Sequence, residues 1–166
     1  MIRIIGIDPG LAKIGFGIID SENNKYVHVA HGTLPTDSSD STDIRLDAIY
    51  KGLCSILTKY KPEEAGVESL FFSKNISSAL PVAQARGVII LALKHCEVKV
   101  FNYSPLAIKM SVTGSGSADK HQMQQMVKII LGLKKISDTD HSADALAAAV
   151  CHLNNRGSSF LKQLEG

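Results

Sequence analysis

The chain has 166 residues and a mass of 17.8 kDa, which is enough for one domain with a hydrophobic core and too little for two. Its composition, with 45% hydrophobic and 20% charged residues, excludes intrinsic disorder, a collagen-like fibre and a coiled coil. The net charge of +2 does not indicate nucleic-acid binding by itself, although residues 51–166 hold fourteen Lys and Arg against nine Asp and Glu.

Three strands are predicted first: residues 3–8 and 14–20 are apolar runs rich in β-branched residues, and residues 25–34 have strand character after a turn at 21–24. Apolar residues then recur at helical spacing over residues 43–60, and Lys61-Pro62 ends this amphipathic helix. The first part of the chain is therefore predicted as three strands followed by a helix.

A short buried strand is predicted over residues 65–70, followed by an apolar helix within 76–95 and a strand over 98–103. Two further helices are expected, one from 118 to about 133 and one from about 139 to 153. The order of these elements predicts an α/β protein with a mixed sheet and helices on both faces.

We expect residues 1–154 to form a single domain and residues 155–166 to form a mobile C-terminal tail. No run of about 18 apolar residues occurs, and the chain begins without the pattern of a signal peptide, so we expect a cytoplasmic protein without a membrane partner. Cys54, Cys96 and Cys151 lack C-x-x-C spacing, and we expect them to be small buried apolar residues.

Two predicted strands carry a single acid each. Asp8 ends the first strand, where ligands bind in many α/β sheets, but an Asp that caps the Pro9-Gly10 turn is an equally good interpretation. Glu68 lies in an apolar strand, and Glu is seldom buried without a partner. The alternative for Glu68 is a solvent-facing edge position.

A histidine and a further acid occur at the start of the last predicted helix. His141 and Asp144 are three residues apart and therefore project from one face of its first turn. Asp138, Thr139 or Asp140 could cap the helix, which would explain one acid but not the pair. Three carboxylates and an imidazole from two strands and a helix predict a site for hard divalent metals.

In these residues and their neighbours the sequence resembles the RuvC family of Holliday junction resolvases, which have a ribonuclease H-like fold with a five-stranded mixed sheet. The motifs that carry the resemblance are residues 6–10 with Gly15 and Gly17, Glu68 with Phe71-Phe72-x-Lys74-Asn75, and residues 84–87, 114–120 and 143–147. Gly15 and Gly17 are expected at a bulge or a close approach within the second strand.

The resemblance implies that Asp8, Glu68, His141 and Asp144 are the catalytic residues and hold two Mg²⁺ ions, for which Mn²⁺ can substitute. Many relatives have an aspartate at the position of His141, and others have a histidine. Its role therefore stays open between a metal ligand and a group that orients or deprotonates the attacking water.

The resemblance also marks Lys109 and Lys120 as contacts to the DNA backbone. Gly114, Gly116 and Ser117 precede a predicted helix, and exposed backbone N–H groups there would form a phosphate site. A bound phosphate would also offset the unfavourable position of Lys120 at the positive end of the helix.

Three further DNA contacts are expected on weaker grounds. Lys74 and Arg86 are basic residues that could equally well be solvated surface residues. For Phe71 the resemblance suggests a ring that stacks on an unpaired base, and the alternative is core packing.

The resemblance implies an endonuclease of recombination and repair that resolves four-way DNA junctions and leaves 5′-phosphate and 3′-hydroxyl ends. The symmetry of the junction implies a homodimer, and the apolar helix within residues 76–95 is the expected interface. The RuvA–RuvB branch-migration complex is an expected partner. Two other interpretations are a nucleotide-binding domain of the actin and sugar-kinase type and a junction-binding module without catalytic activity.

Overall fold

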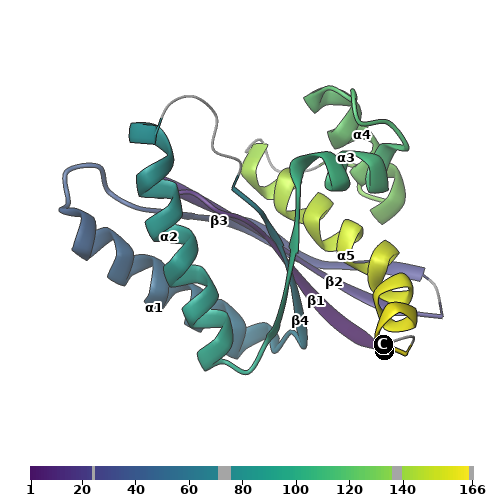
Figure 1. Cartoon of the computed structure of the whole chain (residues 1–166), viewed down its shortest axis with the longest axis horizontal. Coiled ribbons are helices and arrows are strands. Elements are labelled where there is room, and N and C mark those ends of the chain that lie inside the picture. Colours follow the sequence, from purple (N-terminus) through teal and green to yellow (C-terminus); the bar gives the residue numbers. More distant parts are fainter. Residues whose placement is uncertain (24, 71–75, 136–139, 165–166) are drawn as a thin grey trace.

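A five-stranded mixed sheet forms the centre of the protein, in the strand order β3-β2-β1-β4-β5. The computed structural model describes residues 1–23, 25–70, 76–135 and 140–164 (Figure 1). β1 pairs with β2 in antiparallel and with β4 in parallel orientation. The elements are β1 (Ile2–Asp8), β2 (Lys13–Glu22), β3 (Lys25–Pro35), α1 (Thr42–Tyr60), β4 (Glu64–Glu68), α2 (Ile76–His95), β5 (Lys99–Tyr103), α3 (Pro105–Thr113), α4 (Lys120–Leu131) and α5 (Asp140–Leu164).

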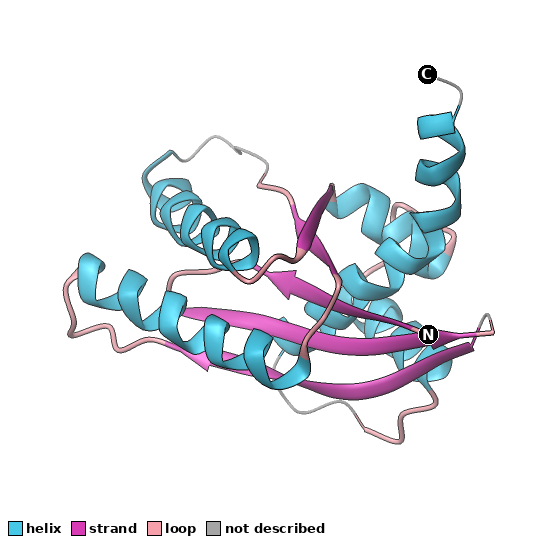
Figure 2. Cartoon of the chain, turned by 90° about the horizontal axis from the view of Figure 1, so that it is seen from below, coloured by secondary structure: helices cyan, strands magenta, loops and turns pink. Residues whose placement is uncertain are grey.

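Helices cover both faces of the sheet, which confirms the predicted mixed α/β architecture (Figures 1 and 2). α1 and α2 pack on one face and α3, α4 and α5 on the other. Each face of the sheet has its own hydrophobic core, and alternate residues of β1 belong to one or the other. Ile5 and Ile7 pack against α1 and α2, whereas Ile4 packs against α5. Within the described residues, no helix is both long and apolar enough to cross a membrane.

Glycines in the sheet allow α5 to lie directly against the strands. A Cβ atom on Gly6 would lie 1.9 Å from the carbonyl oxygen of Ala145, and one on Gly15 would lie 1.9 Å from that of His141. A Cβ atom on Gly17 would lie 2.7 Å from the side chain of Leu146. The expected close approach at Gly15 and Gly17 is confirmed, while the bulge in β2 and β3 lies at Ile18/Ile19 instead.

The structure contains a helix, α3, that the sequence analysis did not predict. The Ser104 hydroxyl accepts a hydrogen bond from the Ala107 N–H at 3.0 Å, and Pro105 occupies the first turn, where its missing N–H costs nothing. Gly114, with φ 74°, ends the helix in the left-handed conformation. Pro105 after Ser104, followed nine residues later by Gly114, is a helix signal that the sequence analysis overlooked.

The last helix is longer than predicted. It was expected to end near residue 153, but α5 continues to Leu164 and so includes most of the segment expected to form a tail. Polar contacts extend the packing of α5 beyond its apolar part, because the Asn154 amide donates to the Ser111 carbonyl oxygen at 3.0 Å and the Arg156 guanidinium to Glu64 at 3.0 Å. These partners lie on α3 and β4, so sequence periodicity could not reveal them.

We expect Gly6→Ala to lower the free energy of unfolding by about 3 kcal/mol, because the new methyl group collides with the α5 backbone. Gly87→Ala is the matched control, since a Cβ atom there meets nothing within 4 Å. This change lies in α2 and should leave the stability unchanged or raise it by up to about 1 kcal/mol. Urea unfolding followed by circular dichroism measures both. Equal stabilities of the two variants would contradict the close packing of α5.

Candidate active site

Two acids lie side by side where β1 and β4 end. These parallel strands pair Ile7 with Val67, so the next residues, Asp8 and Glu68, are neighbours at the same edge of the sheet. Both follow a glycine by two positions, Gly6 and Gly66, that faces α5, and their side chains therefore lie on the α5 face. Neither acid is an exposed surface residue, since the Asp8 side chain is only 15% exposed.

The first turn of α5 brings a histidine and a third acid to the same place. His141 Nδ1 lies 2.7 Å from Asp8 Oδ2, across the close contact between Gly15 and the α5 backbone. Asp144, one turn further along α5, is 34% exposed at its side chain. The structure thus brings together the four residues that the sequence analysis selected as one site.

The electrostatics of this cluster are dominated by burial and by repulsion between carboxylates. Burial, followed by the charges of Asp8 and Asp144, raises the pKa of Glu68 to about 7. Burial also raises the pKa of Asp144, and the charge of Asp8 adds to this shift. The site therefore holds more negative charge than its surroundings neutralise.

Two lysines border the same cluster. A cavity of about 270 Å³ is lined by Glu68 and Asp144 together with Lys109 of α3 and Lys120 of α4. The Lys120 ammonium lies 3.0 Å from a carboxylate oxygen of Asp140 and 3.7 Å from one of Asp144. Both predicted backbone-binding lysines thus stand next to the acids, and Lys109 does so from the helix that the sequence analysis missed.

Lys120 at the start of α4 is stabilised by acids rather than by a phosphate. Burial opposes its charge, but the hydrogen bond to Asp140 and the charges of Asp144 and Asp8 raise the pKa of Lys120. Asp119 caps α4 by accepting from the Gln122 N–H at 2.8 Å, and the Gln122 side chain accepts from the Asp119 N–H at 2.9 Å. Sequence reasoning missed Asp140 as a partner because the pair joins two helices.

The loop before α4 already uses several of its backbone N–H groups. The Gly114 N–H donates to Met110, the Ser115 N–H to Thr113 Oγ1 at 3.1 Å and the Ser117 N–H to Ser115 Oγ at 3.4 Å. Gly116 lies against the end of Leu106. The loop is thus built differently from the open phosphate cradle expected from its sequence, and contact of Gly114, Gly116 and Ser117 with DNA stays a prediction.

Arg86 of α2 makes contacts within the protein at the end of β4. Its guanidinium donates to the Glu68 carbonyl oxygen at 3.4 Å and to the Asn102 side chain. This arrangement connects the end of β4, and with it the backbone of Glu68, to β5. A role of Arg86 in binding DNA stays a prediction, and Phe71 and Lys74 lie outside the residues that the structure describes.

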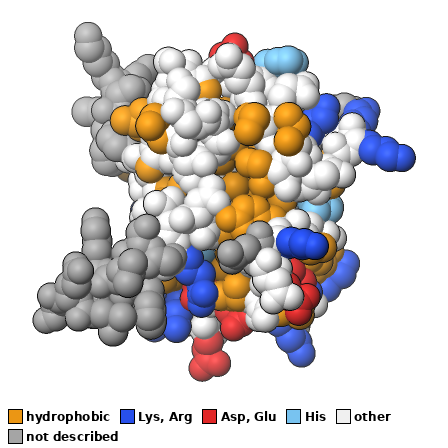
Figure 3. Space-filling view, turned by 90° about the vertical axis from the view of Figure 1, so that its right-hand side faces the viewer, with side chains coloured by type: hydrophobic (Ala, Val, Ile, Leu, Met, Phe, Trp, Pro, Cys, Tyr) orange, Lys and Arg blue, Asp and Glu red, His pale blue; other side chains and the backbone are white. Residues whose placement is uncertain are grey.

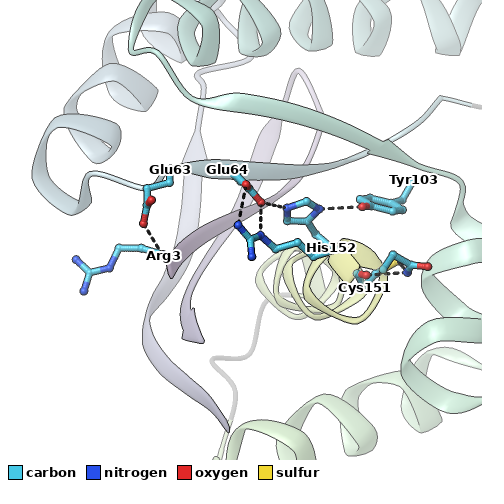
Figure 4. A network of polar contacts seen from close by, with 8 residues as sticks. Arg3, Glu63, Glu64, Tyr103, Cys151 and His152 are labelled. Carbon is cyan, nitrogen blue, oxygen red and sulfur yellow. Dashed lines mark hydrogen bonds and ion pairs between the residues drawn. The ribbon is translucent and has the colours of Figure 1, made fainter. Parts of the chain in front are cut away.

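At the other end of β4, a buried polar network fixes α5 to the sheet (Figure 4). His152 Nε2 lies 2.8 Å from a Glu64 carboxylate oxygen, and Nδ1 lies 2.8 Å from the hydroxyl of Tyr103. Burial lowers the pKa of His152, which favours a neutral ring between an accepting carboxylate and a donating hydroxyl. The sequence analysis missed this network, because its members are 88 and 49 positions apart in the chain.

In the described part of the chain, no three His, Cys, Asp or Glu side chains surround one point as metal ligands would. Instead, His141 contacts Asp8, and Lys120 contacts Asp144. The donor types nevertheless suit a hard cation, since carboxylate oxygens predominate and carry uncompensated charge.

Comparison with known proteins gives a consistent result. The family model for "Crossover junction endodeoxyribonuclease RuvC" matches residues 4–152. RuvC of Fusobacterium nucleatum is 48% identical over 95% of this chain and 83% of its own, and RuvC of Clostridioides difficile is 45% identical over 98% of this chain and 97% of its own.

A solved structure agrees with the sequence comparisons. Thermus thermophilus RuvC in complex with a Holliday junction substrate superposes with a TM-score of 0.86, at 28% identity, over 95% of this chain and 96% of that one. Together with the matched model and the curated relatives, this similarity shows that the chain belongs to the RuvC family of crossover junction endodeoxyribonucleases.

Proposed function

We propose that this chain is a structure-selective endonuclease that resolves Holliday junctions by hydrolysing phosphodiester bonds, in recombination and repair. The observation that carries the proposal is the convergence of Asp8, Glu68, His141 and Asp144 at one end of the sheet, in a member of the RuvC family. Family membership excludes the nucleotide-binding alternative. The presence of all four side chains in one cluster supports an active enzyme over a module that only binds junctions.

Membership of this nuclease family implies dependence on a divalent metal. We assign the metal to Asp8, Glu68 and Asp144, because buried carboxylates with excess negative charge need a cation. Oxygen ligands favour Mg²⁺, and two Mg²⁺ ions are our proposal for the natural cofactor, with Mn²⁺ as a substitute that imidazole also suits. Such ions, when bound, activate water and neutralise charge on the phosphate.

His141 and Asp8 act as a pair in this proposal. His141 Nδ1 lies 2.7 Å from Asp8 Oδ2, so in the tautomer with the proton on Nδ1 the ring would donate to Asp8 and leave Nε2 as a proton acceptor. This arrangement favours His141 as the group that orients or deprotonates the attacking water. The alternative, ligation of a metal through Nδ1, would require this contact to break.

The remaining roles concern the two lysines and the oligomeric state. Lys109 and Lys120 border the acids and would contact the backbone of the DNA strand that is cut. Exposed Leu80 and Leu91 on α2 support a homodimer through this helix. Figure 3 shows the end of the molecule away from α2, where apolar side chains are bordered by Lys and Arg and also by Asp and Glu. The RuvA–RuvB partner and the cytoplasmic location stay predictions.

The proposal predicts symmetric cleavage of a synthetic four-way junction and little cleavage of a linear duplex of the same sequence, in the presence of Mg²⁺. Asp144→Asn should lower the cleavage rate at least about a hundredfold while junction binding survives, because it removes negative charge and leaves the phosphate contacts. Asp47→Asn is the matched control, since Asp47 is exposed on α1 and pairs with Lys51.

Gel assays of cleavage and of binding, carried out on the same variants, separate the two effects. Equal cleavage of duplex and junction would contradict selectivity for junctions. A full rate in Asp144→Asn would remove this residue from the site.

His141→Ala should lose most cleavage activity, whereas His141→Asp should retain part of it, because a carboxylate can also accept a proton or a metal. Single-turnover rates with Mg²⁺ and with Mn²⁺ measure this difference. A parental rate in His141→Ala with both metals would show that His141 has no role in cleavage.

Without metal, Glu68→Gln should stabilise the protein above pH 7. The folded state raises the pKa of Glu68 to about 7, so its contribution to stability is present below about pH 4.5 and is lost as the pH rises through 7. Glutamine mimics the protonated form, and the variant should gain on the order of 2 kcal/mol over the parent between pH 5 and 8. Glu22→Gln, at an exposed strand end, is the control. Unfolding in EDTA across this pH range tests the prediction, and parallel curves would contradict it.

A further inference from the structure

The face of the sheet that α1 and α2 cover is lined by apolar side chains. Cys54 and Cys96 are only partly buried there, so the expectation of buried cysteines is confirmed for Cys151 alone. Arg86 of α2 follows the buried Ala85, is itself half-buried and reaches the end of β4. This arginine therefore approaches the candidate active site from the side of the sheet that α5 does not cover (Figure 1).

The Glu68 carboxylate and the Arg86 guanidinium lie on opposite faces of the sheet. In the pairing of β4 with β5, Val67 is opposite Asn102 and Glu68 is opposite Tyr103. Val67 belongs to the core beneath α1 and α2, so Asn102 lies on that face together with Arg86. Side chains alternate along a strand, and those of Glu68 and Tyr103 therefore point toward α5, where the Tyr103 hydroxyl lies 2.8 Å from a histidine nitrogen.

The guanidinium of Arg86 joins three elements of the fold. Its Nε donates to the Glu68 carbonyl oxygen at 3.4 Å, and its Nη2 donates to the side-chain oxygen of Asn102. The Ser69 N–H donates to the Tyr103 carbonyl oxygen at 2.8 Å, which ties the residue after Glu68 to β5 as well. Because a guanidinium holds its donors in a rigid fork, this one side chain sets the spacing between α2, the end of β4 and β5.

Glu68 needs such a restraint because of its place at the end of a strand. The pairing of β1 with β4 runs from Ile4 to Ile7 on β1 and so stops one residue before the two acids. When ionised, the carboxylates of Asp8 and Asp144 repel that of Glu68. The β1 ladder therefore does not hold Glu68 against this repulsion, and the contacts toward β5 and α2 are the ones that oppose it.

We propose that Arg86 is a positioning residue, which holds the end of β4 and thereby places the Glu68 carboxylate for metal binding. Arg86 acts from the opposite face of the sheet, through the backbone of Glu68, and touches neither the metal nor the DNA. The inference rests on the proposed function, because it takes Glu68 as a metal ligand of the nuclease. The alternative, a direct contact of Arg86 with the DNA backbone, is a separate outcome of the test.

Arg86→Met removes the donors and keeps a side chain of similar length. We expect the variant to bind Mn²⁺ about tenfold more weakly than the parent, because residues that orient a metal ligand contribute to metal affinity. Titration of the full chain with Mn²⁺ alone, with the free ion followed by electron paramagnetic resonance, measures this affinity. Cleavage of a synthetic junction at saturating Mn²⁺ should also slow about tenfold, whereas junction affinity in EDTA and its salt dependence should stay parental.

Asn102 offers a second way to break the same contact. Asn102→Leu, at an exposed position of β5, removes the acceptor without altering α2 and should weaken Mn²⁺ binding at least about threefold. Asn102→Asp keeps an oxygen for the guanidinium and should retain the parental affinity and rate. Arg45→Met is the matched control, because Arg45 is also a half-buried arginine with a hydrogen bond, to Thr36 at 2.9 Å, but lies on α1.

Parental Mn²⁺ affinity in Arg86→Met would overturn the proposal. Weaker junction binding with a salt slope lower by about one, at parental Mn²⁺ affinity, would make Arg86 a DNA contact instead. An equal loss of Mn²⁺ affinity in Arg45→Met or in Asn102→Asp would indicate a general loosening of the fold and would also overturn it. A parent protein that binds Mn²⁺ but cleaves no junction would contradict the proposed function alone, since the Mn²⁺ affinities of the variants still decide the role of Arg86.

Discussion

Helix α5 lies against the sheet with hardly any side chain between the two backbones where it crosses Gly6 and Gly15. This contact sets the height of the helix above β1 and β2, and hence the position of its first turn. His141 meets Asp8 because the α5 backbone can approach Gly15. A larger residue at either glycine would displace the turn that carries His141 and Asp144.

The first turn and the middle of α5 show how one helix serves both structure and function. Near its middle, the buried pair of Glu64 and His152 satisfies its polar groups completely within the protein. Hydrogen bonds from Arg156 and His152 lower the pKa of Glu64, although burial alone would raise it. At its first turn, burial and then the charges of Asp8 and Asp144 raise the pKa of Glu68 instead. The same strand, β4, therefore holds a neutralised acid at its start and an unneutralised one at its end.

The two faces of the sheet also differ in how far their charged groups are neutralised. The α5 face carries the acids, the lysines and the cavity between them, and its charges are balanced only in part. The α1 and α2 face is mostly apolar, and its polar contacts include the Tyr50 hydroxyl at 2.8 Å from His95 Nδ1.

The sequence by itself predicted the strands, most helices and the four residues that the structure brings together in the candidate site, because apolar periodicity and acids within apolar runs are local signals. Asp8 and Glu68 stood out since each is an acid next to a mostly apolar run of strand residues. The tertiary structure alone decided which charges neutralise which. The pairs of Lys120 with Asp140 and of Glu64 with His152 each join different elements of the fold. Such pairs depend on how the backbones approach one another, and local patterns carry no information about that distance.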